Sequence, residues 1–287
     1  MYPTNFDYHR PSSLAEAAAL LDKDPEARLL AGGHSLLAAM KLRLATPSAL
    51  VDLAAVPDLA GISEAGGALR IGGMTTHTAV AESALVGSSC PLLVETAAHI
   101  GDQQVRNRGT IGGSLGHADP AADYPTALLA LDAVVETGGS VSRRIPIGRF
   151  FTGLLSTALD RAEIIVAVHV PTYGSGTGGS YVKHRHPASS FAVVGVAALV
   201  TVSGGVCSAV KLAVGGVSVN PVRALDAEAA LVGQPPGDAA FATAAAKVAG
   251  AVTRPISDLY ASGEFRLHLA GVLARRALGA AARAAGG

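Results

Sequence analysis

The sequence predicts an α+β protein of two or three units, and its length, the order of its segments and its composition lead to that prediction. The chain has 287 residues, roughly twice the usual length of one domain. Its first fifty residues alternate between strand-like and helix-like segments in βαβ order. Its last third places strands first and helices later, as a compact α+β unit does. Apolar residues make up 49% of the chain, which is enough for a sizeable core.

The N-terminal segment begins with a well-marked helix. Ser13 and Glu16 have the spacing of a capping box before an alanine-rich run, and Pro25 lies just after that run. A strand, a helix and a second strand are then expected at 28–33, 36–44 and 49–53.

From Pro57 onward the pattern changes to short strands and apolar helices. Helices are expected after Thr75, from Pro91 at a first helical turn, and at about 121–131. The strands expected in this part are 68–73, 133–137 and 163–171.

The C-terminal third begins after a glycine-rich stretch at 174–180, which we interpret as a flexible connection. The run 191–210 has no charged residue and is long enough to span a bilayer. Its β-branched residues and the Ser203-Gly204-Gly205 turn instead favour a buried hairpin. Helices are expected around 223–232, 238–249 and 263–284.

Composition excludes several classes of function. The 22 basic and 22 acidic residues give no net charge, which argues against binding to nucleic acid or to an anionic membrane. Cys90 and Cys207 are far apart and form no CxxC, so the chain alone builds no disulfide framework, all-cysteine cluster or zinc ribbon. The N-terminus has no apolar signal region, and a cytoplasmic protein is expected.

Two glycine pairs are candidate phosphate-binding sites. The segment 31–35, Ala-Gly-Gly-His-Ser, stands between an expected strand and an expected helix. The segment 108–114, Arg-Gly-Thr-Ile-Gly-Gly-Ser, has a second glycine pair flanked by hydroxyls. Glycine pairs let backbone N–H groups turn toward a phosphate, and hydroxyls can add further hydrogen bonds. Either segment alone could be an ordinary turn, but two of them suggest a ligand with two phosphates.

Other motifs give weaker signals. The stretch 174–179 matches the pattern GxGxxG, but no helix follows it, so we do not interpret it as a dinucleotide site. His117 with Asp119, and His184 with His186, lack a third metal ligand at standard spacing. Asp123, just before an apolar helix, could instead bind sugar hydroxyls. No nucleophile elbow or Walker A loop supports acyl transfer or ATP hydrolysis.

Taken together, these segments resemble the FAD-binding medium subunits of the molybdenum hydroxylases, the xanthine dehydrogenase family, and within it those of aerobic carbon monoxide dehydrogenase. The likeness extends over essentially the whole chain. The stretches that carry it are 29–43, 100–125, 163–171, 181–198 and 262–278.

The resemblance implies a fold and a domain division. The fold would be an FAD-binding domain of the PCMH or vanillyl-alcohol-oxidase type with two α+β subdomains, followed by a C-terminal α+β flavoprotein domain. FAD would lie in the cleft between them. The implied boundaries are 1–56, 57–173 and 174–287.

The resemblance also implies the cofactor-binding residues. Two glycine segments would bind the pyrophosphate: Leu29, Leu30, Ala31, Gly32, Gly33, His34, Ser35 and Leu36 in the first, and Thr110, Ile111, Gly112, Gly113 and Ser114 in the second. Other residues would line the flavin pocket or bond the cofactor: Ile100, Asp123, Ile165, Val166, Lys183 and Phe191. Phe191 stands where relatives carry Tyr or Trp, so a hydroxyl is lost there while apolar packing is kept. No catalytic residue and no metal ligand is expected in this chain.

The function that the resemblance implies is electron transfer inside a larger enzyme. A small subunit would carry 2Fe-2S clusters and a large subunit the molybdenum cofactor, in a dimer of heterotrimers. FAD would pass electrons to quinone, NAD or oxygen. Carbon monoxide is the first candidate substrate, with N-heterocycles and aldehydes as alternatives. Contact with the inner face of the membrane would be peripheral and through partners. A stand-alone FAD oxidoreductase and a non-catalytic scaffold remain open.

Overall fold

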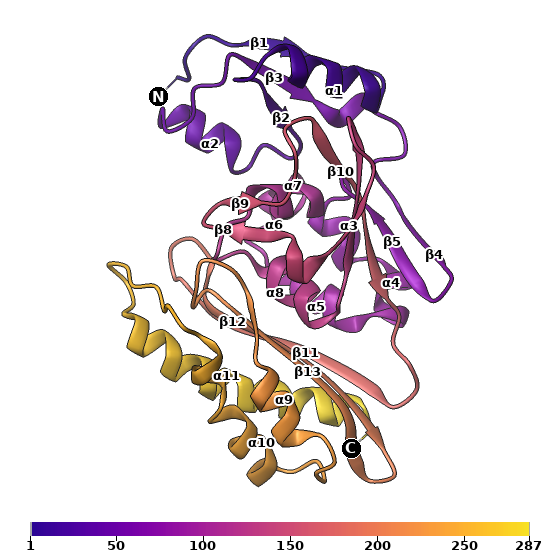
Figure 1. Cartoon of the computed structure of the whole chain (residues 1–287), viewed down its shortest axis with the longest axis vertical. Coiled ribbons are helices and arrows are strands. Elements are labelled where there is room, and N and C mark those ends of the chain that lie inside the picture. The colour runs from indigo at the N-terminus through magenta and orange to yellow at the C-terminus, as the bar shows by residue number, and fades with distance from the viewer. Residues whose placement is uncertain (1, 287) are drawn as a thin grey trace.

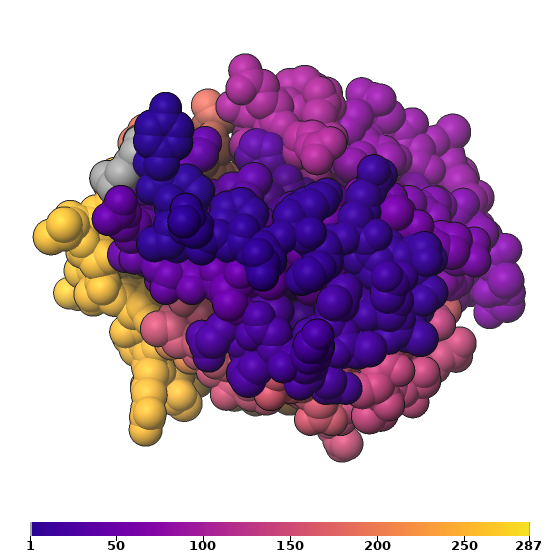
Figure 2. Space-filling view, turned by 90° about the horizontal axis from the view of Figure 1, so that it is seen from above, coloured from indigo at the N-terminus to yellow at the C-terminus, as the bar shows by residue number. Residues whose placement is uncertain are grey.

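The computed structural model describes residues 2–286, and its three main sheets follow one another along the long axis of the molecule (Figure 1). The N-terminal unit lies at one end, the central unit with most of the short helices lies in the middle, and the C-terminal unit lies at the other end. Seen from above, the N-terminal unit covers its end of the molecule, with the C-terminal region showing beyond its edge (Figure 2).

The first sheet is parallel and confirms the expected βαβ alternation. Its strands lie in the order β1-β3-β2 and are β1 (Asp7–His9), β2 (Arg28–Leu30) and β3 (Ala49–Asp52). The helices between them are α1 (Leu14–Lys23) and α2 (Leu36–Lys41). Ser13 caps α1, because its side chain accepts a hydrogen bond from the N–H of Glu16 at 3.2 Å. The carboxylate of Glu16 returns to the N–H of Ser12 rather than to that of Ser13.

The second sheet is antiparallel and has the order β4-β5-β10-β6-β7. Its strands are β4 (Ile62–Ala65), β5 (Ala68–Gly72), β6 (Val134–Gly139), β7 (Arg144–Pro146) and β10 (Glu163–Pro171). The central strand β10 is mostly buried, as its apolar run predicts. A small hairpin of β8 (Phe151–Gly153) and β9 (Ser156–Thr157) precedes it.

Six helices connect β5 to β6. They are α3 (His77–Ala81), α4 (Ala84–Ser89), α5 (Pro91–Ala98), α6 (Gln103–Arg106), α7 (Ile111–His117) and α8 (Asp123–Ala130). Pro91 stands at the first position of α5, as expected, because proline has no N–H to leave unpaired there. Helix α8 is buried along its whole length, so the apolar segment at 121–131 lies in the core.

The third sheet contains the expected buried hairpin. Its order is β11-β12-β13-β14, with β11 (Thr177–Arg185), β12 (Ala192–Ser203), β13 (Val206–Gly215) and β14 (Val222–Arg223). Gly204 and Gly205 connect β12 to β13 with φ values of 60° and 79°, a conformation that glycine adopts without strain. In the described part of the chain, no helix is long and apolar enough to cross a membrane.

Three helices complete the C-terminal unit. They are α9 (Leu225–Leu231), α10 (Asp238–Ala245) and α11 (Gly263–Ala284).

The glycine-rich stretch at 174–180 is not simply a flexible connection, since strand β11 already begins at Thr177. A Cβ on Gly178 would lie 2.2 Å from the carbonyl oxygen of Ala281 in α11. Glycine is therefore needed there for close packing of a helix on a strand.

The hydrophobic core runs across the boundary between the second and third sheets. One cluster joins β10 and helices α5 and α8 to residues of the third sheet such as Tyr181, Ala197 and Ala213. A second cluster lies between the third sheet and helices α9 to α11. A third, smaller cluster fills the N-terminal unit around α1 and β3. Because the first cluster is shared, the C-terminal unit is packed against the central unit.

A cleft between the three units

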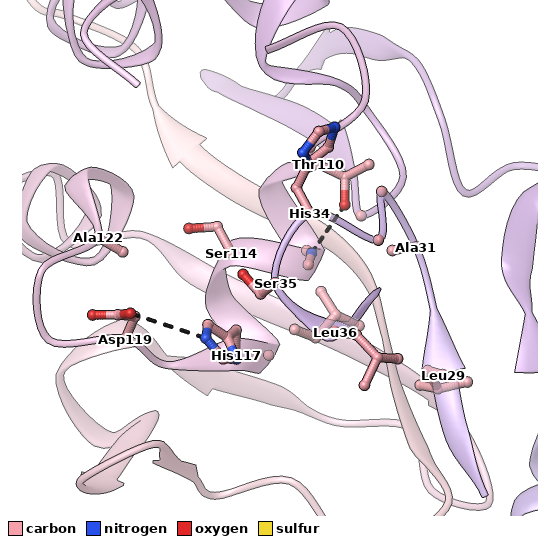
Figure 3. A pocket seen from close by; sticks show the side chains of 18 of the residues that line it. Leu29, Ala31, His34, Ser35, Leu36, Thr110, Ser114, His117, Asp119 and Ala122 are labelled. Carbon is pink, nitrogen blue, oxygen red and sulfur yellow. Dashed lines mark hydrogen bonds and ion pairs between the residues drawn. The ribbon is translucent and has the colours of Figure 1, made fainter. Parts of the chain in front are cut away.

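A cleft of about 550 Å³ is lined by residues from all three units. Most of the residues predicted for the site lie on its walls: Leu29, Ala31, Gly32, Gly33, His34, Ser35, Leu36, Ile100, Thr110, Gly112, Gly113, Ser114, Asp123, Ile165 and Phe191. Four predicted residues do not line it, namely Leu30, Ile111, Val166 and Lys183. Figure 3 shows His34 and Ser35 of the first glycine segment beside Thr110 and Ser114 at the start of helix α7.

The first glycine segment offers a row of backbone N–H groups. Strand β2 ends at Leu30, and Gly33 has a φ of 77°, which turns the chain before α2 begins at Leu36. Within the described chain, the N–H groups of residues 32–36 donate to no other backbone group. A row of free N–H groups on the wall of a cleft is suited to an anion such as a diphosphate.

The second glycine segment plays a different part from the one its sequence suggests. Residues 111–114 are not a loop but the first turn of α7, capped by Thr110. Their N–H groups donate to the carbonyls of Thr75, Gly73 and Thr110 and to the hydroxyl of Thr110. These N–H groups are therefore already used inside the protein. What the segment offers the cleft is its hydroxyl groups, whereas its glycines serve close packing, since a Cβ on Gly112 would lie 2.6 Å from the carbonyl oxygen of Gly73.

The two glycine segments touch each other directly. A Cβ on Gly32 would lie 2.2 Å from the carbonyl oxygen of Arg108 and 2.7 Å from Cα of Gly109. A Cβ on Gly109 would in turn lie 2.5 Å from Nε2 of His77. Glycine is required at both positions because two backbones and an imidazole ring meet there.

His77 also lines the cleft, although the sequence did not predict it. It stands at the start of α3, beside the cleft, and only 5% of the residue is exposed. Burial, and to a smaller extent the neighbouring His34 and Arg106, lowers the pKa of His77 to about 4. The ring is thus neutral near pH 7, and its Nδ1 has no hydrogen-bond partner in the described chain. A lone histidine in a Thr-Thr-His-Thr stretch gave no sequence signal for this position.

One end of the cleft is an apolar slot in the N-terminal unit. Its walls include Leu21, Pro25, Ala27, Leu29 and Leu53. The guanidinium of Arg161 closes part of this end by donating to the carbonyls of Leu21 and Asp22. A flat ring could lie in such a slot.

The other end is formed by Ile100, Asp123, Ser189, Ser190 and Phe191. Phe191 is 43% exposed, so its ring stands at the rim of the cleft rather than in the core. At the rim, the apolar ring of Phe191 can pack against a bound ligand, as predicted for this residue.

Asp123 is buried in an ion pair beside the same end. Its two carboxylate oxygens each accept a hydrogen bond from Nζ of Lys183 at 2.9 Å, and Oδ1 accepts another from the Tyr181 hydroxyl at 2.6 Å. Burial raises the pKa of Asp123, while Lys183 and Tyr181 act in the opposite direction. Lys183 is held by this pair and does not reach the cleft wall.

The remaining polar side chains do not form a metal site. Nε2 of His117 lies 4.0 Å from Oδ2 of Asp119, an ion pair that Figure 3 marks. His184 lies on β11 with its ring near that of Phe265. Within the described residues there is no group of three His, Cys, Asp or Glu side chains placed to hold a metal ion. The cleft as a whole suits an elongated ligand with a central diphosphate and a ring at each end.

Comparison with known proteins agrees with this geometry. Residues 4–173 match the family model described as "FAD binding domain in molybdopterin dehydrogenase", and residues 180–281 match "CO dehydrogenase flavoprotein C-terminal domain". The chain is 39% identical over 283 residues to the carbon monoxide dehydrogenase medium chain of Hydrogenophaga pseudoflava, covering 98% of each. It is 40% identical over 280 residues to the corresponding chain of Afipia carboxidovorans, covering 97% of each.

The chain is also similar to a solved structure. A chain of carbon monoxide dehydrogenase from Hydrogenophaga pseudoflava, in a form that lacks the Mo-pyranopterin moiety of the molybdenum cofactor, superimposes with a TM-score of 0.94. The two chains are 41% identical, and the match covers 98% of each.

Proposed function

Since this chain belongs to the FAD-binding medium subunits of the molybdenum hydroxylases, we propose that it carries electrons from 2Fe-2S clusters of a partner subunit, through FAD, to an external acceptor. When bound, FAD supplies a redox centre that takes up electrons singly or in pairs. The protein's own part is to hold, orient and shield that cofactor.

The observation that carries the proposal is the row of free N–H groups at residues 32–36 on the wall of the cleft. These groups would bind the pyrophosphate of FAD, with the hydroxyls of Ser35, Thr110 and Ser114 beside them. The isoalloxazine ring would lie toward Ile100 and Phe191, and the adenine in the apolar slot around Leu29.

The partners in this proposal are a small 2Fe-2S subunit and a large molybdenum subunit, assembled as a dimer of heterotrimers. The medium-chain names of the relatives support a multi-subunit enzyme. This chain has only two cysteines, and Cys90 and Cys207 are both buried. It therefore offers too few thiolates for clusters of its own.

Carbon monoxide is the substrate we propose for the complete enzyme, because the relatives cited above are carbon monoxide dehydrogenases. The substrate would be oxidised on the large subunit, so this chain would need no acid or base for that step. The acceptor would be reduced at the cleft, and quinone, NAD and oxygen are the candidates to be tried.

A spectrum of the purified chain, alone and with its native partners, tests the proposal. We expect a flavin spectrum, release of free FAD on denaturation, and co-purification of iron–sulfur and molybdenum subunits. Carbon monoxide should bleach the flavin only in the complex. A colourless chain that neither takes up FAD nor brings down such partners contradicts the proposal. Flavin reduction by a substrate in the isolated chain indicates a stand-alone oxidoreductase instead.

A further inference from the structure

A buried ion pair connects the C-terminal unit to the flavin end of the cleft. Nζ of Lys183, on β11, lies 2.9 Å from both carboxylate oxygens of Asp123, the first residue of α8. The side chains of Lys183 and Asp123 are 1% and 4% exposed. Asp123 lines the cleft, whereas Lys183 lies behind it.

Lys183 also holds a second segment of the cleft wall. Its ammonium group donates to the carbonyl oxygen of His99 at 2.8 Å, and the next residue, Ile100, lines the cleft. The pair thus fixes the end of α5 and the start of α8 relative to β11. The hydroxyl of Tyr181 completes the arrangement with its bond to Asp123.

From this geometry we propose that Lys183 is a positioning residue that holds Asp123 as a charge-balanced carboxylate beside the isoalloxazine ring, so that the pair sets the local charge felt by the flavin. This inference rests on the proposed function, because it takes FAD to be the occupant of the cleft.

The physical reason is the weak screening of buried charges. A pair with both charges present is close to neutral at a distance, but removal of one partner leaves the other uncompensated in a medium of low dielectric constant. A negative charge beside a flavin disfavours the uptake of electrons, and a positive charge favours it. The other titratable groups near the pair are Glu95 from α5, His99 just after α5, Tyr124 from α8, and Tyr181 and Arg185 from β11.

The test compares the midpoint potential of bound FAD at pH 8 in the FAD-loaded full chain and three variants. The variants are Asp123→Asn, Lys183→Met and the double variant. We expect a higher potential in Asp123→Asn than in Lys183→Met, with the double variant between them and near the wild type. Tyr181→Phe removes one hydrogen bond without changing a charge, and it serves as the matched control with little shift.

Thermal unfolding of the FAD-free proteins separates charge from folding. Both single variants should be less stable than the double variant, because each leaves a buried charge without its partner. Should Lys183→Met not fold, a higher potential in Asp123→Asn than in the wild type still supports the pair.

Equal potentials in all FAD-loaded variants, or the reverse order, overturn the inference and leave the pair a purely structural contact. That result differs from failure of the proposed function, in which the wild-type chain itself would not retain FAD.

Discussion

At the scale of single residues, the glycines of the cleft show why their positions do not tolerate a side chain. Gly32 lies against the backbone of residues 108–109, and the row of free N–H groups begins at this residue. A methyl group there would force the two segments apart. The N–H groups that follow would then no longer share one wall with Thr110 and Ser114.

Gly32→Ala is therefore expected to weaken FAD binding by about tenfold or more, which corresponds to about 1.4 kcal/mol or more. The dissociation constant of FAD, from fluorescence titration of the FAD-free chain, measures this effect. Gly87→Ala is the matched control, because Gly87 is an exposed helical residue and its added Cβ would meet nothing within 4 Å. Equal affinity in the two variants would show that the contact at Gly32 does not matter.

The surroundings of Glu163 predict how the stability of the fold depends on pH. Its carboxylate accepts hydrogen bonds from Arg143 at 2.5 and 2.8 Å and from Thr137 at 2.5 Å, and the residue is 3% exposed. The Arg143 guanidinium is the main cause that lowers the pKa of Glu163 from 4.5 to about 2. A lowered pKa in the folded state stabilises the fold above pH 4.5, and this contribution disappears as the pH falls from 4.5 to about 2.

In Glu163→Gln, this acid-dependent contribution should be missing. We expect the variant to lose less stability than the wild type between pH 4.5 and 2, by about 1–3 kcal/mol. Urea unfolding of the FAD-free chain over that range measures the difference. Asp238→Asn, which removes an exposed ion pair with Arg275, should change the same curve much less. Parallel curves for wild type and Glu163→Gln would contradict the prediction.

At the scale of elements, β11 and α7 show how similar sequence patterns reach different structures. The GxGxxG stretch looks like a nucleotide-binding loop, yet its last residues form a strand under α11. The segment 110–114 looks like a loop, yet it is a capped helical turn whose N–H groups are already bonded. The partners of β11 and of the Ile111 and Gly112 N–H groups are distant in the sequence.

Gly178→Ala tests the close packing of β11 against α11. The added Cβ would collide with the backbone at Ala281 and Ala285, and overpacking of this kind costs about 1–3 kcal/mol of stability. Chemical denaturation of the full chain gives the value. Gly271→Ala is the matched control in α11 itself, since its Cβ would lie 3.6 Å from the nearest atom outside its own turn. Should the two variants be equally stable, α11 is free to move away from the strand.

At the scale of the whole molecule, the cleft is one elongated site built by three units. Its apolar slot and its N–H row belong to the N-terminal unit, Thr110 and Ser114 on its wall to the central unit, and its rim at Phe191 to the C-terminal unit. A ligand that fills the whole cleft should therefore tie the three units together. A ligand that fills one end should not.

FAD is thus expected to raise the thermal midpoint of the chain by several degrees, and ADP or FMN alone by clearly less. At a hundredfold excess over its dissociation constant, a ligand of the folded state adds about 2.7 kcal/mol of stability. Differential scanning calorimetry of the FAD-free chain with each ligand at the same concentration measures this. An equal shift with FMN and with FAD would place the binding energy at one end only.

The sequence by itself determined where most of the longer strands and helices lie, though not β1 or α7, and it marked the two glycine segments beside the cleft. Helix caps, turn glycines and apolar periodicity are local signals, because each depends on residues within a few positions of one another. They were enough to predict the βαβ start, the buried hairpin at 191–210 and the helices of the last third. The resemblance of these segments to one family also pointed to cofactor-binding residues, and most of those residues line the cleft.

Only the tertiary structure decided which groups are free to bind a ligand. Whether an N–H group is available depends on acceptors far away in the chain, as for Gly112, whose N–H is bonded to Gly73. Likewise, Lys183, a predicted cofactor contact, lies behind the wall of the cleft, because its ammonium group is bonded to Asp123 and to the carbonyl oxygen of His99. His77 enters the site only because α3 packs beside the second glycine segment. Such pairings join residues tens of positions apart, and local sequence patterns carry no record of them.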